Sequence, residues 1–273
     1  MKNKLIIVLL AIVATFNSCY KTGEIIYQPV CKTVQLKMED FNYTLSSPVL
    51  WGQRPYNSFD YTTGSTRRLI KATGLGQPVP YNHTFGYDSN NNLIRINRFV
   101  NGAAISYYVL AYPDGTKNSA SNVINVYEFT PDNNLTYSYA LNYNTEYQLL
   151  SMYATYPYNH LMFSYAYDFA GNCTKAISYI SDGRISSTLE FTSYDNKTNP
   201  GRTDRPMQIF ISDYSKNNCT NSIASRYSYD IETGAATVKK DTISSTYEYN
   251  NNLPISRNGA LYGIYDCNTI TAN

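Results

Sequence analysis

The sequence has 273 residues, with 22 basic against 20 acidic side chains and a formal net charge of +2. Because the two signs are interspersed and neither forms a run, the charge pattern does not favour nucleic acid as a partner. Tyrosine is the unusual component, with 29 copies against 10 phenylalanines and 1 tryptophan. Tyrosine favours half-buried strands, and the abundant Asn and Ser favour turns. The composition therefore predicts an all-β protein made of many short strands.

Residues 1–18 have the pattern of a lipoprotein signal peptide. Lys2 and Lys4 provide a positive start, and the apolar run LIIVLLAIV follows at positions 5–13. At about 1.5 Å per residue in a helix, this run covers about half of a ~30 Å hydrocarbon core. It is therefore too short for a stable transmembrane helix, and we expect it to direct export and to be removed.

The segment FNSC at positions 16–19 resembles a bacterial lipobox, with Asn17 where a smaller residue is usual. The resemblance implies cleavage before Cys19 and lipidation of that residue, which anchors the protein to the outer membrane. The alternative is an ordinary secretory signal cut near Ser18. Surface-displayed lipoproteins often carry an acidic cluster just after the cysteine, whereas Glu24 stands alone here. The membrane face on which the protein lies is therefore left open.

Residues 19–80 are expected to form an irregular N-terminal strand region. Pro and Gly interrupt its short apolar runs, as in SSPVLWGQRPY and ATGLGQPVPY. Residues 81–273 have a different organisation, based on a recurring pattern, and we expect the two regions to belong to one domain.

The recurring pattern is an aromatic residue, a turn-forming segment, and an apolar or small residue six positions after the first. Its copies are Tyr87 to Leu93, Phe129 to Leu135, Tyr143 to Leu149, Tyr167 to Cys173 and Tyr229 to Ala235, with a shortened relative, YEYNNNLPISR, at 247–257. The segments between are rich in Asp, Asn, Gly and Pro, so each copy predicts a β-hairpin. In series they predict a single long antiparallel meander of hairpins that forms a curved sheet or an open barrel-like structure.

Alternation within the segments supports strands. In TYSYALNY at 136–143, a period of two places Tyr137, Tyr139 and Tyr143 on one face. In NLIRINRF at 92–99 the same period of two places Leu93 and Ile96 on opposite faces of the strand. The polar segment SYDNKTNPGRTDRP at 193–206 is expected to be a long loop.

The stretch FSYAYDFAGNCTK at 163–175 resembles the tyrosine-aspartate (YD, or Rhs-like) repeat, whose units read Tyr-x-Tyr-Asp-x-x-Gly-Asn-x-Thr. The matching positions are Tyr165, Tyr167, Asp168, Gly171, Asn172 and Thr174. Over about residues 85–257 the chain looks like a group of Bacteroidota lipoproteins with degenerate YD-like repeats, which implies a long antiparallel meander. Large Rhs proteins wall a shell around a toxic domain with many such repeats, and this chain has too few copies to do so.

The tyrosines have two interpretations. As a binding face for glycan or protein, the candidates are Tyr137, Tyr139, Tyr143, Tyr165 and Tyr167. Exposed rings bring a large contact area with few rotatable bonds, which suits recognition. The alternative is construction, in which the rings cover the sheet and pair across strands.

Four cysteines remain beyond Cys19. Cys31, Cys173, Cys219 and Cys267 either form two disulfides of open connectivity or serve as small buried hydrophobes. There is no CxxC pair and there are only two histidines, so we expect no zinc site and no other metal or cofactor.

The sequence offers little for catalysis. His83 and His160 lie in no nucleophile motif and are expected in loops or on strand surfaces. We therefore predict an exported, lipid-anchored envelope protein that is a non-enzymatic structural or binding module. The alternative is a glycan-processing enzyme with carboxylates gathered from separate hairpins. The triplet DTI at 241–243 makes Thr242 a candidate for O-glycosylation.

Overall fold

A computed structural model describes residues 31–36, 58–63, 67–74, 81–112, 123–146, 148–200, 215–261 and 263–267. The chain divides into two compact units. One comprises residues 1–31 and 267–273, and the other comprises residues 32–266. Apart from one disulfide, the description below concerns the second unit.

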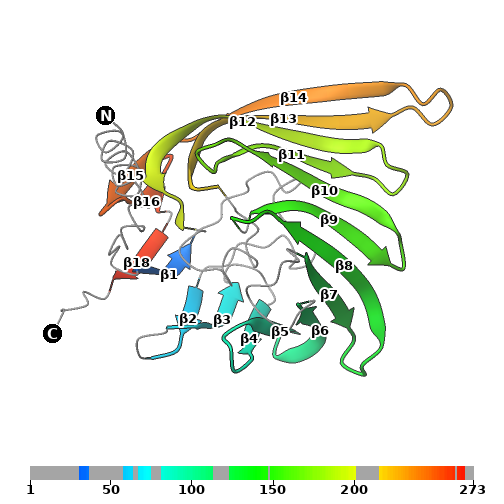
Figure 1. The fold of residues 1–273 in the computed structure, drawn as a ribbon. Coiled ribbons are helices and arrows are strands. Elements are labelled where there is room, and N and C mark those ends of the chain that lie inside the picture. The colour runs from blue at the N-terminus through cyan, green and yellow to red at the C-terminus, as the bar shows by residue number, and fades with distance from the viewer. Residues whose placement is uncertain are drawn as a thin grey trace, which may run out of the picture. The chain divides into compact units, whose positions relative to one another are not determined.

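Thirteen strands of this unit form one antiparallel sheet in which every strand pairs with its neighbours along the chain (Figure 1). They are β2 (Ser58–Tyr61), β3 (Leu69–Gly74), β4 (Tyr81–Tyr87), β5 (Leu93–Val100), β6 (Ala103–Ala111), β7 (Val123–Phe129), β8 (Leu135–Tyr143), β9 (Leu149–Tyr156), β10 (His160–Tyr167), β11 (Cys173–Tyr179), β12 (Ile185–Thr198), β13 (Asn217–Tyr229) and β14 (Ala236–Ser244). The end strands β2 and β14 do not pair with each other, so the sheet is open. The predicted all-β antiparallel meander is confirmed.

Two small sheets complete the described residues. β1 (Cys31–Leu36) pairs with β18 (Gly263–Cys267). β15 (Tyr247–Asn250), β16 (Leu253–Arg257) and β17 (Ala260–Leu261) form a three-stranded antiparallel sheet. The side chains of Asp195 and Lys197 in β12 reach this sheet, through hydrogen bonds with Tyr249 and Asn252.

The recurring sequence pattern coincides with the hairpins. β4 ends at Tyr87 and β5 begins at Leu93, and β10 ends at Tyr167 and β11 begins at Cys173. The same agreement holds for the copies after Phe129 and Tyr143, whereas after Tyr229 the next strand begins one residue later than the pattern predicts, at Ala236.

The turn after Tyr167 shows why Asp, Gly and Asn recur there. Asp168 Oδ1 accepts a hydrogen bond from the Asn172 amide at 2.9 Å, and the Gly171 amide donates to the Asp168 carbonyl at 3.0 Å. Gly171 has φ +86°, and the equivalent residues Asn91 and Asn133 have φ +67° and +63°. This left-handed conformation favours Gly and Asn, which is why those residues occupy the position.

One face of the sheet, here called the inner face, carries the hydrophobic core. Tyr108, Leu110, Val126, Leu141 and Met152 on this face are at most 2 % exposed. They come from β6 to β9, and the same cluster continues onto β2 to β5 and β10. Farther along the sheet, Ala176, Leu189 and Ala224 form a second and smaller cluster. The inner face is therefore packed mainly over β2 to β10.

Two local expectations were wrong. The alternation in 92–99 is broken by a bulge, because Gly86 pairs with Arg95 and Tyr87 pairs with Leu93. Leu93 and Ile96 consequently both reach the core. The segment expected to be a loop from residue 193 remains in β12 as far as Thr198, with Tyr194 paired to Cys219 across β13.

The change of organisation expected near residue 80 is not a break in the sheet. β3 pairs with β4 as regularly as β4 pairs with β5. The region 19–80 therefore contributes β2 and β3 to the same sheet as the hairpin repeats.

Candidate functional site

The five tyrosines of the predicted binding face do not form an exposed surface. Tyr139 and Tyr143 are each 5 % exposed and belong to the core. Tyr165 and Tyr167 are half-buried and pack against it. Tyr137 alone among the five is exposed, at 42 %. Tyr137, Tyr139 and Tyr143 do lie on one face of the strand, as the period of two predicts. That face is the inner one, where Tyr139 and Tyr143 are buried.

Several tyrosine hydroxyls are instead bound to the backbone of a neighbouring strand. Tyr167, the last residue of β10, donates to the carbonyl of Leu149, the first residue of β9, at 2.9 Å. We call such tyrosines latches, and each acceptor is the first residue of the preceding strand. The latches are Tyr87 to Leu69 at 2.7 Å, Tyr112 to Leu93 at 3.1 Å, Tyr167 to Leu149 at 2.9 Å, Tyr229 to Ile185 at 2.8 Å, and Tyr194 to Cys173.

A latch satisfies a carbonyl at the point where a strand begins. Strand-end carbonyls lie beside turns, where the ladder of backbone hydrogen bonds is interrupted, and a buried unpaired carbonyl is costly. Since the tyrosine ring also packs on the sheet, one side chain contributes both apolar burial and a hydrogen bond. The latches therefore fix consecutive strands to one another near the turns.

A second feature is an inner polar cluster that consists of His83, Arg98, Ser106, Tyr108 and Glu128. Cross-strand pairing brings these residues together from β4 to β7. His83 is opposite Arg98, Arg98 is opposite Ser106, and Tyr108 is opposite Glu128. Directly opposed residues share a face of the sheet, so the cluster lies on the inner face beside the core.

Burial controls the charges of the cluster. His83 is 0 % exposed, and burial together with the nearby Arg98 guanidinium lowers the pKa of its imidazole to about 3. The expectation that His83 lies on a loop or strand surface was therefore wrong, and its ring is neutral at physiological pH. Burial raises the pKa of the Glu128 carboxyl, against the opposing effects of Tyr108, Ser106 and Arg98.

The cluster has a limited chemical repertoire. Glu128 is its one carboxyl group, whereas glycoside hydrolysis commonly uses two, about 5–10 Å apart. Within the part of the chain that the structure describes, no group of three or more His, Cys, Asp and Glu side chains could hold a metal ion. The cluster therefore offers a neutral imidazole and a carboxyl of raised pKa, but it has no carboxylate pair.

Next to this cluster, aromatic side chains are exposed where β8 begins and where β9 turns into β10. Tyr137 stacks on Tyr139, with ring centroids 6.2 Å apart and an interplanar angle of 23°. Tyr158, in the turn, is 59 % exposed and meets the ring of His160 edge-on at 6.2 Å. Glu128 is opposite Tyr137 across β7 and β8. We call Glu128, Tyr137, Tyr139, Tyr158 and His160 the aromatic rim.

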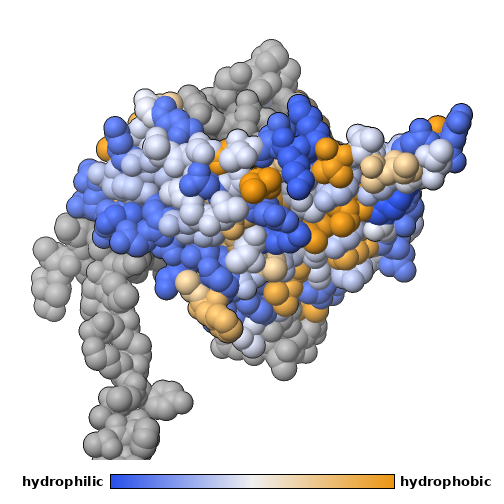
Figure 2. All heavy atoms as spheres, turned by 90° about the horizontal axis from the view of Figure 1, so that it is seen from above, coloured by the Kyte–Doolittle hydropathy of each residue, from blue (hydrophilic) through white to orange (hydrophobic). Residues whose placement is uncertain are grey.

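The remaining exposed apolar side chains are distributed over the sheet. Val238 is 44 % exposed, and Ile231, in the turn between β13 and β14, is 99 % exposed. Figure 2 shows apolar residues interspersed with hydrophilic ones on the face seen from above. This face thus resembles an ordinary protein surface, in which scattered apolar side chains are normal.

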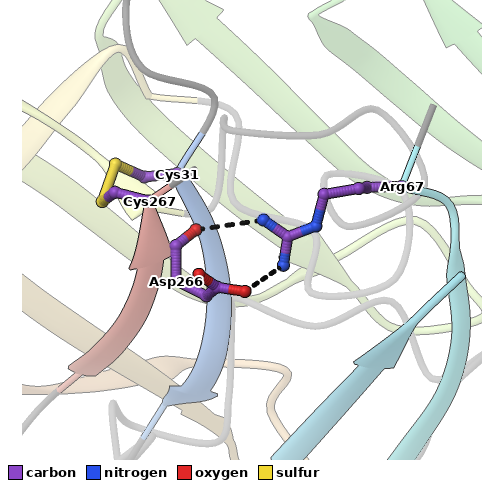
Figure 3. The surroundings of a disulfide bond; sticks show 4 residues. All are labelled: Cys31, Arg67, Asp266 and Cys267. Carbon is purple, nitrogen blue, oxygen red and sulfur yellow. Dashed lines mark hydrogen bonds and ion pairs between the residues drawn. A yellow bond between two sulfur atoms is a disulfide. The ribbon is translucent and has the colours of Figure 1, made fainter. Parts of the chain in front are cut away.

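Of the four cysteines beyond Cys19, two form a disulfide and two do not. Cys31 and Cys267 form a disulfide (Figure 3), whereas Cys173 and Cys219 are thiols, with Cys173 buried. Beside the disulfide, Figure 3 also shows the side chain of Arg67 directed toward Asp266. The Arg67 guanidinium binds the Asp266 carboxylate at 2.6 Å and the Asp266 carbonyl at 3.2 Å.

Of the two candidate modification sites, Thr242 lies among the described residues and Cys19 does not. Thr242 is exposed on the edge strand β14, opposite Ile223 of β13. Cys19 and the signal segment lie outside the described residues. Among the residues described, no helix is long and apolar enough to cross a membrane.

The chain was compared with known families, curated proteins and solved structures. No known family matches the sequence, and no curated protein matches it either. Among solved structures, a porin-like protein from Bacteroides uniformis is similar at 11 % identity and a TM-score of 0.34. The match covers 76 % of this chain and 92 % of that one.

Proposed function

We propose that the protein is a non-enzymatic scaffold of the bacterial cell envelope, exported and held at the outer membrane by lipid on Cys19. The observation that carries the proposal is the set of tyrosine latches. Five tyrosines, of a residue type that suits a binding platform, are used here to hold one strand to the preceding one. What remains is a broad, open sheet that can present its loops and rims to other envelope components.

The latches also support the proposal that the hairpins are degenerate YD-like repeats. Tyr87, Tyr167 and Tyr229 occupy the tyrosine position of the repeat, and each donates to the preceding strand. The acceptors Leu149 and Cys173 occupy the position six residues after a repeat tyrosine. In the pair Tyr167 and Leu149, a repeat tyrosine donates to the residue that closes the preceding copy, which gives the spacing of these two copies a structural reason.

Lipidation is tested by mass spectrometry of the mature protein purified from cell membranes. We expect an N-terminal peptide that begins at Cys19 and carries acyl chains. A Cys19→Ala variant should lose the acyl chains and leave the membrane fraction. A mature protein that begins elsewhere, or that has no acyl chain at Cys19, would contradict the anchoring part of the proposal.

The enzymatic alternative is less well supported. It requires a pair of carboxylates from separate hairpins, and the inner polar cluster contributes Glu128 alone. Prolonged incubation with soluble oligosaccharides, followed by chromatography, should give no shorter products. Products that disappear in a Glu128→Gln variant would establish the enzyme and overturn the non-enzymatic proposal.

A further inference from the structure

Three strands determine the geometry of the aromatic rim. Tyr139 in β8 is opposite Ala154 in β9, and Ala154 is in turn opposite His160 in β10. Neighbouring strands lie about 4.8 Å apart, so the backbones of β8 and β10 are about 10 Å apart, and the short side chain of Ala154 lies between Tyr139 and His160 in this row. The Tyr137–Tyr139 pair and the Tyr158–His160 pair are thus two separate aromatic groups on one face of the sheet.

In each pair, the exposed ring of Tyr137 or Tyr158 contacts its partner ring on one side and is accessible on the other. Tyr137 stacks on Tyr139, which is itself only 5 % exposed. Tyr158 meets the ring of His160 edge-on. Because the rings are positioned before any ligand arrives, little conformational entropy remains to be lost on binding.

We propose that the aromatic rim binds a neutral oligosaccharide, with Tyr137 and Tyr158 stacking on sugar rings and with Glu128 and His160 hydrogen-bonding to sugar hydroxyls. The proposal rests on the proposed function in one respect, because it describes a ligand that a non-enzymatic scaffold holds without cleaving it. Aromatic faces next to a few polar groups match a sugar, whose C–H faces are apolar and whose edges are polar.

The sheet itself argues against an extended peptide. β8, β9 and β10 are each paired on both sides, so this part of the sheet offers no open edge to which a peptide could add a strand. The acidic group of the rim is Glu128, on which the Arg98 guanidinium of the neighbouring inner polar cluster already acts, so a neutral ligand fits the rim better than an anionic one. Recognition here must use side-chain stacking and hydrogen bonds to side chains, as a saccharide requires.

The experiment is isothermal titration calorimetry of the purified protein with cellohexaose, xylohexaose, mannohexaose and laminarihexaose at up to millimolar concentration. We expect at least one of them to bind. Tyr137→Ala and Tyr158→Ala should each weaken that binding by about tenfold or more, which corresponds to about 1.4 kcal/mol. Tyr137→Trp keeps a stacking face and should retain the binding, which separates a stacking role from a folding defect.

Tyr153 provides the matched control. It is 40 % exposed on β9 and lies next to Ala154, so it projects from the opposite face of the sheet. Tyr153→Ala should leave the affinity unchanged. The proposal is overturned if none of the four hexasaccharides binds, or if Tyr153→Ala weakens binding as much as Tyr137→Ala does. Neither result would affect the test of Cys19 acylation, so failure of the rim is distinguishable from failure of the scaffold.

Discussion

The hydroxyl of Tyr167 illustrates how a single residue type can build this sheet. It reaches the carbonyl of Leu149, 18 positions earlier, while its ring packs against the core. A phenylalanine at this position would pack but leave the carbonyl without its partner. A leucine would provide neither the reach nor the hydrogen bond. Tyrosine suits the latch positions because its side chain is apolar along its length and polar at its tip.

His83 gives a prediction at the same scale. Its folded-state pKa is about 3, below the ordinary value of 6.5, so below pH 6.5 the unfolded chain binds a proton that the folded chain excludes. Stability should therefore fall as pH decreases from 6.5 toward 3, with a limiting slope of about 1.4 kcal/mol per pH unit.

Urea unfolding between pH 6.5 and 5 measures that slope above the range in which most carboxylates titrate. A His83→Gln variant should lose it. A Glu128→Gln variant separates this effect from that of the Glu128 carboxyl, whose raised pKa acts in the opposite sense. A His83→Gln variant with the same slope as the wild type would contradict the burial of a neutral His83.

At the scale of the element, the hairpin turn is the part best predicted from sequence. Its Asp, Asn and Gly residues act locally, through hydrogen bonds that span at most a few positions, as Asp168 and Gly171 show. At the five full copies of the pattern, where one strand ends and the next begins was therefore predicted to within a residue. Which face is buried was not, because the bulge opposite Gly86 reverses the alternation after Leu93.

The sites were harder to predict than the turns, because they depend on register between strands. A latch joins residues 18 or more positions apart, and the inner polar cluster needs correct pairing across β4 to β7. His83 and Glu128 have no neighbouring sequence motif that could connect them. The tyrosine spacing was visible in the sequence, but its hydrogen-bond acceptors were not.

Gly183 tests the turn chemistry. It has φ +87°, and a Cβ atom placed there would meet nothing within 4 Å, so any cost of substitution comes from the backbone. Gly183→Ala should lower the free energy of unfolding by about 1–2 kcal/mol. Gly183→Asn should cost less, because Asn91 and Asn133 adopt this conformation at the equivalent position. Equal losses for the two variants, measured by thermal unfolding, would be inconsistent with this explanation.

At the scale of the whole molecule, the Cys31–Cys267 disulfide closes nearly the full length of the chain, since its cysteines are 236 positions apart. Such a cross-link stabilises mainly by restricting the unfolded chain, typically by about 2–4 kcal/mol. A Cys31→Ser/Cys267→Ser variant should therefore unfold at a lower temperature. Reductant should lower the melting temperature of the wild type and leave that of the variant unchanged. A wild type that is insensitive to reductant after full reduction, checked by thiol titration, would contradict this role.

If the latch tyrosines hold the sheet together, two quadruple variants should differ in stability. One removes four latch hydroxyls, in Tyr87→Phe, Tyr112→Phe, Tyr167→Phe and Tyr229→Phe. The other removes four hydroxyls from exposed tyrosines, in Tyr137→Phe, Tyr153→Phe, Tyr156→Phe and Tyr158→Phe. The measurement is the free energy of unfolding in urea. At about 0.5–1.5 kcal/mol per hydrogen bond, the first variant should lose about 2–6 kcal/mol and the second close to none. Equal losses in the two variants, or no loss in the first, would contradict the claim.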